Sequence, residues 1–128
     1  MSKILVIDDE PSIRELLDTI LRRKGYDVVL ADTGQKGLDI FRQERPDVVV
    51  LDLKMPGMDG LTVLQHVRSL PPNQSVVILT GAGTPEAEQQ VRALGVTEFV
   101  EKEFSLHHLG DALKRLLMHT TPFDILSR

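Results

Sequence analysis

K-I-L-V-I-D-D-E-P, residues 3–11, joins a short apolar run to three acids and a proline. The run Ile4–Ile7 is typical of a buried strand. Pro11 favours the first turn of a helix, where its missing N–H group costs nothing, and Gly25 is well placed to end that helix. Apolar residues at the spacing of one helical face lie between them: Ile13, Leu16, Leu17, Ile20 and Leu21. The stretch therefore predicts a strand, an acidic turn and a helix.

The same alternation continues along the chain. Further apolar runs predict strands at residues 28–31, 48–51, 75–80 and 96–100. Amphipathic stretches predict helices at about residues 34–44, 60–70, 84–94 and 105–117. In the helix at 34–44, Leu38 and Phe41 are expected to face inward. Because strands and helices alternate strictly across short loops, we expect an α/β fold with a parallel sheet covered on both faces.

Composition excludes several classes of protein. The 128 residues suit one domain, and the net charge of −4 argues against a nucleic-acid-binding surface. The absence of cysteine excludes disulfides, thiolate zinc sites and thiol nucleophiles. The apolar runs are far shorter than the roughly 20 residues that cross a bilayer, and the N-terminus does not resemble a secretory signal. We therefore expect a cytoplasmic protein without membrane contact.

Polar residues stand where the predicted strands end. Asp8 and Asp9 follow the first strand, and Asp52 follows the third. Thr80 ends the fourth strand, and Lys102 follows the fifth. Because ligands of such sheets bind beyond the carboxyl ends of the strands, these side chains are expected to meet there. The carboxylates would repel one another, and Mg²⁺, which prefers oxygen ligands, would remove that repulsion.

This set of residues suits phosphoryl transfer. A carboxylate such as Asp52 can attack phosphorus and form an aspartyl phosphate. Mg²⁺ held by Asp9 and Asp52, with Lys102 on the opposite side, would neutralise the phosphoryl oxygens, and Thr80 could donate a hydrogen bond to one of them. Each residue also has a plainer interpretation taken singly: Asp9 and Glu10 as favourable charges at a helix N-terminus, Asp52 as a turn cap, Lys102 as a surface lysine. Their joint position at one sheet edge favours the chemical interpretation.

Four segments together carry a family resemblance. They are V-I-D-D-E (6–10), L-D-L-K-M-P-G-M-D-G (51–60), L-T-G-A-G (79–83) and F-V-E-K (99–102). The chain resembles the receiver domain of bacterial two-component response regulators, of the chemotaxis-regulator kind, over about residues 3–118. The resemblance implies a flavodoxin-like (βα)5 three-layer sandwich with a five-stranded parallel sheet of order 2-1-3-4-5. The receiver domain would span residues 1–118, and 119–128 would be a C-terminal tail or the start of a linker.

The resemblance also implies roles for the site residues. Asp52 would be the phosphoacceptor. Asp9 would bind Mg²⁺ directly and Asp8 through water, with the backbone carbonyl of Lys54 as a further ligand. Thr80 and Lys102 would contact the phosphoryl group. Phe99 would be the aromatic switch residue. Its ring would turn inward as the Thr80 hydroxyl moves toward the phosphoryl group.

The implied function is a phosphorylation-controlled signalling module. Its donor would be a sensor histidine kinase or a phosphotransfer protein. The surface formed by the fourth helix, fifth strand and fifth helix would change and control an effector domain or a downstream protein. The module would not be an enzyme beyond catalysing its own phosphorylation and slow autodephosphorylation. Members of the family commonly dimerise through their fourth and fifth helices. The sequence leaves open whether this protein forms a homodimer.

Two positions stand out against the family pattern. Glu103 replaces the proline that usually follows the lysine, commonly after a cis bond. Because a cis bond before a non-proline residue costs roughly 3–4 kcal/mol, a trans 102–103 peptide is predicted. The Lys54 side chain, two residues beyond the acceptor, is at a position that tunes phosphate lifetime in the family, although a solvated lysine explains it equally well.

Two alternative functions use the same architecture. A haloacid-dehalogenase-like, magnesium-dependent phosphatase would need a second aspartate two residues after Asp52 as general acid, and Lys54 stands there. A flavin- or nucleotide-binding protein would need a glycine-rich phosphate loop at a helix N-terminus. The turn V-I-D-D-E-P is instead acidic, and T-G-A-G-T is the only weak candidate for such a loop.

Overall fold

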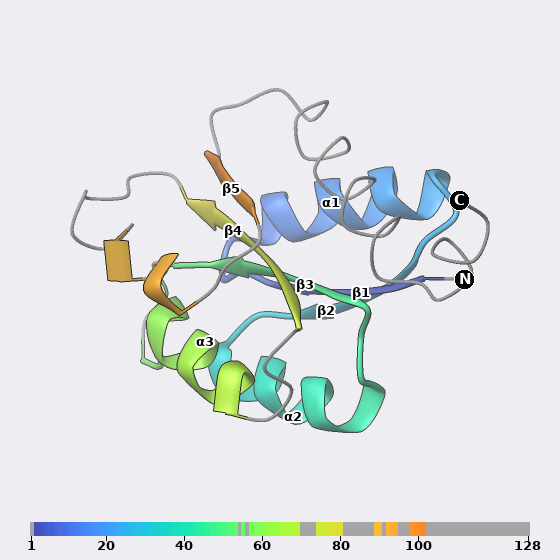
Figure 1. Ribbon diagram of the computed structural model, residues 1–128. Helices are drawn as coiled ribbons and strands as arrows, with labels where there is room; N and C mark the ends of the chain where they lie inside the picture. The colour runs from blue at the N-terminus through green and yellow to red at the C-terminus, as the bar shows by residue number, and fades with distance from the viewer. Residues whose placement is uncertain are drawn as a thin grey trace, which may run out of the picture.

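The fold is seen in a computed structural model that describes residues 2–53, 55, 57–69, 74–80, 89–90, 92–94 and 98–101, with only the backbone for Thr80 and 98–101 (Figure 1). The helix predicted at 105–117 and the tail at 119–128 lie outside these residues. So does most of the helix predicted at 84–94, of which residues 89–90 and 92–93 are helical. Within the described part of the chain, no helix has the length and apolarity to cross a membrane.

A five-stranded parallel sheet forms the centre of the described fold. Its strands are β1 (Lys3–Ile7), β2 (Asp27–Ala31), β3 (Val48–Asp52), β4 (Ser75–Thr80) and β5 (Glu98–Glu101). They lie in the order β2-β1-β3-β4-β5, as expected for a flavodoxin-like sheet. The strand order reverses between β1 and β3, and this pair therefore forms the switch point where such folds bind ligands.

Helices cover both faces of this sheet. Helix α1 (Pro11–Arg23) lies on one face, and α2 (Gly34–Glu44) and α3 (Gly60–Ser69) lie side by side on the other (Figure 1). The alternation predicted from the sequence is thus confirmed for these elements. Strands β3 and β5 each run one residue beyond the predicted end, so that Asp52 is the last residue of β3 and not the first residue after it.

Among the described residues, the core consists of two apolar clusters, one on each face of the sheet. Alternate residues of β1 point in opposite directions: Ile4 packs with Leu17 of α1, and Leu5 packs with Leu38 and Phe41 of α2. All five side chains are at most 4% exposed. Burying each such side chain contributes roughly 1.5–3 kcal/mol. The inward positions predicted for Leu38 and Phe41 are confirmed.

The exposure of Leu16 corrects the apolar face that the sequence predicted for the first helix. Leu17 and Leu21 are fully buried, whereas Leu16 is 41% exposed. Successive helical residues are separated by about 100°, and the face that meets the sheet is centred on Leu17 and Leu21. Leu16 therefore lies on the solvent side of that face, and the apolar pattern is wider than the contact.

Candidate functional site

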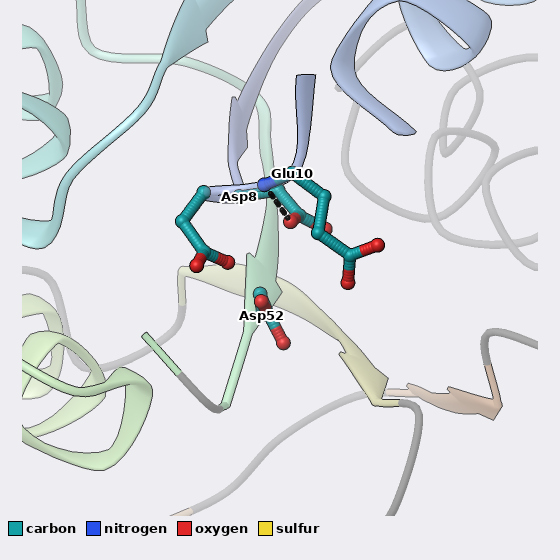
Figure 2. Close-up of side chains that lie close together, drawn as sticks. Asp8, Glu10 and Asp52 are labelled. Carbon is teal, nitrogen blue, oxygen red and sulfur yellow. Dashed lines mark hydrogen bonds between the residues drawn. The ribbon is translucent and has the colours of Figure 1, made fainter. Parts of the chain in front are cut away.

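A tight turn carries the acids that follow β1. The amide of Asp8 donates to the carbonyl of Ala31 at 3.1 Å, which continues the pairing of β1 with β2 beyond the end of the strand. One carboxylate oxygen of Asp8 then accepts the amide of Glu10 at 2.9 Å (Figure 2). The carbonyl of Glu10 accepts the amide of Arg14 at 3.1 Å, and α1 begins at Pro11, as predicted. The turn therefore passes directly from strand to helix.

Asp52 enters the site from the middle of the sheet. It is the last residue of β3, paired with Leu79 of β4, and is 2% exposed. The start of α3 packs against the backbone at the end of β3. The amide of Gly60 donates to the carbonyl of Leu53, the residue after Asp52, at 2.9 Å. A Cβ atom on residue 60 would lie 2.5 Å from the Cα atom of Leu53 and closer still to the carbonyl oxygen of Asp52. Glycine at position 60 therefore permits the close approach that holds Asp52.

Four carboxylates converge at this edge. One oxygen from each of Asp8, Asp9, Glu10 and Asp52 lies within 4.8 Å of the others. Figure 2 shows Asp8, Glu10 and Asp52 gathered beyond the ends of β1 and β3. Asp8 is 1% exposed, so two of the four carboxylates, Asp8 and Asp52, are buried. Like charges this close repel one another, and burial removes the water that would screen them.

The cluster fits a hard divalent cation. All four donors are carboxylate oxygens, the ligand type that Mg²⁺ prefers. With bonds of about 2.0–2.1 Å, ligands on opposite sides of one Mg²⁺ lie about 4 Å apart. Oxygens spaced by up to 4.8 Å could reach that geometry through small side-chain movements. The set as a whole could thus hold one such ion.

The structure brings some predicted site residues together and leaves others undescribed. Asp8, Asp9 and Asp52 meet, as expected from their positions at strand ends. Thr80 ends β4 and pairs with Glu101, and Phe99 pairs with Ile78, so the backbone of Thr80 lies at the same edge as Asp52. The residues that lie outside the described part are Lys54, Lys102 and the 102–103 peptide.

Glu10 is a member of the cluster that sequence reasoning missed. The sequence suggested only a favourable charge at the helix N-terminus for it. In the structure Glu10 occupies the N-cap position of α1 and makes no side-chain capping hydrogen bond. Its carboxylate instead joins the other three. The signal was the third consecutive acid of V-I-D-D-E, directly before the helix.

Comparison with known proteins assigns the family. The family model described as the response regulator receiver domain matches residues 4–114. This chain belongs to the response regulator receiver family. Receiver domains are the signalling modules of two-component systems, and the alternative of a haloacid-dehalogenase-like phosphatase finds no support.

Relatives cover the receiver domain at moderate identity. The sporulation initiation phosphotransferase F of Bacillus subtilis is 38% identical over 115 residues, which are 90% of this chain and 93% of the relative. The response regulator MprA of Mycolicibacterium vanbaalenii is 37% identical over 95% of this chain, which spans 53% of that relative. The receiver thus corresponds to a whole protein in one case and to about half of a protein in the other.

A solved structure agrees with the fold. The response regulator TrrA of Thermotoga maritima, in complex with Mg(2+)-BeF, superposes with a TM-score of 0.83 at 35% identity. The match covers 91% of this chain and 99% of that structure. The flavodoxin-like receiver fold predicted from the sequence is therefore confirmed.

Proposed function

We propose that this chain receives a phosphoryl group on Asp52 from a histidine kinase or a phosphotransfer protein. The observation that carries the proposal is the convergence of four carboxylates, one of which is the buried Asp52 at the end of the central strand. The family supports it, and so does the likeness to a protein named as a sporulation phosphotransferase.

The chemistry assigned to Asp52 is nucleophilic substitution at phosphorus. A carboxylate oxygen of Asp52 attacks the phosphorus of a phosphohistidine, the new P–O bond forms, and the P–N bond to the donor breaks. In the slow loss of this modification, water attacks the same phosphorus and the P–O bond to Asp52 breaks. The Asp52 carboxylate is restored, and the phosphoryl group departs with the water oxygen as inorganic phosphate. The chain thereby catalyses its own phosphorylation and dephosphorylation without turning over a separate substrate.

Asp8, Asp9, Asp52 and the backbone carbonyl of Lys54 are the proposed holders of Mg²⁺. When bound, the ion supplies positive charge that neutralises the acids and the phosphoryl oxygens. Support comes from the close spacing of the carboxylates and from the relative solved in complex with Mg(2+)-BeF. Glu10 brings a fourth carboxylate to the rim of the same cluster.

The output is proposed to follow from three further residues. Thr80 and Lys102 would bind the phosphoryl group, and Phe99 would turn inward behind Thr80. The position of Thr80 at the end of β4, paired with the residue before Lys102, supports this assignment. The surface of the fourth helix, β5 and the fifth helix would then control an effector domain or a downstream protein. A receiver at residues 1–118 and a tail at 119–128 are expectations from the family, and a cytoplasmic location is the expectation from composition. Whether the chain forms a homodimer stays open.

The test is acetyl-phosphate labelling followed by intact-mass measurement. The native protein is incubated with acetyl phosphate and Mg²⁺ beside Asp52→Asn and a matched control, Asp59→Asn. Asp59 is an exposed aspartate outside the cluster whose capping bond to Thr62 an asparagine can keep. We expect one phosphate adduct on the native protein and on Asp59→Asn, and none on Asp52→Asn. Equal labelling of all three proteins would refute the assignment of Asp52.

A further inference from the structure

Arg14 contacts both ends of the acidic turn. Its amide donates to the carbonyl of Glu10 at 3.1 Å, as part of the first helical turn. Its side chain folds back, and Nη1 donates to the carbonyl of Asp8 at 2.8 Å. One residue therefore bridges the two ends of the segment that carries Asp8, Asp9 and Glu10.

At the Asp8 carbonyl, a side chain outside the turn holds the backbone of the turn. Three other backbone groups bond to the main chain or within the turn: Asp8 N to Ala31, Glu10 N to the Asp8 carboxylate, and Glu10 O to Arg14 N. A substitution of Arg14 consequently removes one bond to the turn without altering any acid in it.

Arg14 also brings positive charge to this edge of the sheet. The pKa of Asp32, just beyond β2, is lowered mainly by its bond to Lys36, and the charge of Arg14 adds to the lowering. A positive charge beside a cation site disfavours the cation. The charge of Arg14 and its hydrogen bond should thus act on Mg²⁺ binding in opposite directions, which makes the two effects separable.

We propose that Arg14 is a positioning residue that holds the Asp8–Glu10 turn in the arrangement that accepts Mg²⁺, and that this effect outweighs the repulsion by its charge. The inference rests on the proposed magnesium site. Partners that orient the ligands of a metal commonly change its affinity about 10- to 100-fold when they are removed. The hydrogen bond from Arg14 holds the backbone of Asp8, one residue before Asp9, which is the proposed direct ligand of Mg²⁺.

The experiment measures Mg²⁺ affinity by calorimetric titration, without any phosphoryl donor. We expect Arg14→Met to bind Mg²⁺ about tenfold more weakly than the native protein. The matched control is Arg23→Met, which makes the same charge change at an exposed position about 13 Å further along α1. We expect native affinity for this control. Native or tighter affinity of Arg14→Met would show that charge dominates and would overturn the proposal.

Two further variants separate positioning from general destabilisation. Arg14→Lys keeps the charge and one donor group and should recover most of the affinity. Arg14→Gln is too short to reach the Asp8 carbonyl and should bind as weakly as Arg14→Met, which also covers the case in which Arg14→Met does not fold. In the free protein, the amide resonances of Asp9 and Glu10 should shift in Arg14→Gln and not in Arg23→Met. Failure of Arg14→Lys to recover affinity, or unchanged resonances in Arg14→Gln, would overturn the proposal.

Failure of this inference and failure of the proposed function give different results. If the native protein is labelled on Asp52 and Arg14→Met binds Mg²⁺ with native affinity, only the inference about Arg14 fails. If the native protein binds Mg²⁺ but is not labelled, and Arg14→Met binds it more weakly, only phosphoryl acceptance fails.

Discussion

Asp52 owes its position to its neighbours as much as to its own side chain. It is held by the pairing of β3 with β4 and by the close approach of Gly60 to its backbone. The sequence D-G at 59–60 signals a turn before a helix, but it does not reveal which backbone the glycine will meet. Only the packing of α3 against the end of β3 shows that Gly60 supports the backbone of Asp52.

A substitution at this contact should affect both stability and labelling. Gly60→Ala would place a Cβ atom against the backbone of Asp52 and Leu53, where no flexible side chain can move aside. We expect a loss of about 1–3 kcal/mol in the free energy of unfolding, as for other overpacked sites, together with slower acetyl-phosphate labelling. Urea denaturation measures the first effect. Gln65→Ala, at an exposed position of the same helix, should change stability by less than about 0.5 kcal/mol. A Gly60→Ala variant as stable as this control would contradict the contact.

The meeting of the acids at the strand ends was predicted residue by residue, whereas the place of Glu10 in the cluster was not. Parallel strands bring their carboxyl ends to one edge, and this rule alone predicts that Asp8, Asp9 and Asp52 meet. The direction of the Glu10 side chain depends on how the turn enters α1. That geometry is set by the bond from Glu10 N to the Asp8 carboxylate, which the order of residues does not specify.

Among the secondary-structure elements, α1 shows where the prediction from the sequence agrees with the structure and where it differs. Pro11 begins the helix and Gly25 follows its end, as predicted. Gly25 adopts φ +93°, its amide donates to Arg22, and the amide of Tyr26 donates to Leu21, which together form a Schellman motif. The exposure of Leu16 could not be foreseen, because the angle at which a helix meets a sheet decides which edge of its apolar face is covered.

The end of α1 provides a pH-dependent signal. Tyr26 packs against the cluster of Leu17 and Leu21, and partial burial raises its pKa above the ordinary value of 10.0. A raised pKa in the folded state means that the stability contributed by this group is complete below about pH 10 and is lost as pH rises through the folded pKa. Tyr26 is the only tyrosine and the chain has no tryptophan, so phenolate absorbance reports it alone. We expect a higher titration midpoint in buffer than in concentrated urea. Equal midpoints would contradict the burial.

The whole molecule follows from the alternation of its elements. Continuous apolar strands predict burial on both faces, and the structure buries β1 and β3 between α1 on one side and α2 with α3 on the other. The strand order came from the family resemblance, because periodicity alone does not specify which strands are neighbours. The roles of Thr80, Phe99 and Lys102 depend on side chains outside the described part and stay predictions.

The clustered acids should lower the stability of the whole molecule when Mg²⁺ is absent. Removing one charge relieves the repulsion among the carboxylates, so Asp9→Asn should be more stable than the native protein in the absence of Mg²⁺, by about 0.5–2 kcal/mol. Added Mg²⁺ should stabilise the native protein, since a ligand bound to the folded state raises the unfolding temperature. It should stabilise Asp9→Asn much less. Thermal unfolding with Mg²⁺ or with a chelator measures both effects, and an unchanged or lower melting temperature of metal-free Asp9→Asn would argue against the repulsion.

The dependence of labelling on Mg²⁺ decides whether the acidic cluster works as a magnesium-assisted phosphoacceptor site. The native protein is incubated with acetyl phosphate, either with Mg²⁺ or with an excess of chelator, and its intact mass is measured over time. We expect one phosphate adduct that appears with Mg²⁺ and is nearly absent with the chelator, because the phosphoryl group approaches a cluster of four carboxylates. Labelling at the same rate under both conditions would contradict it.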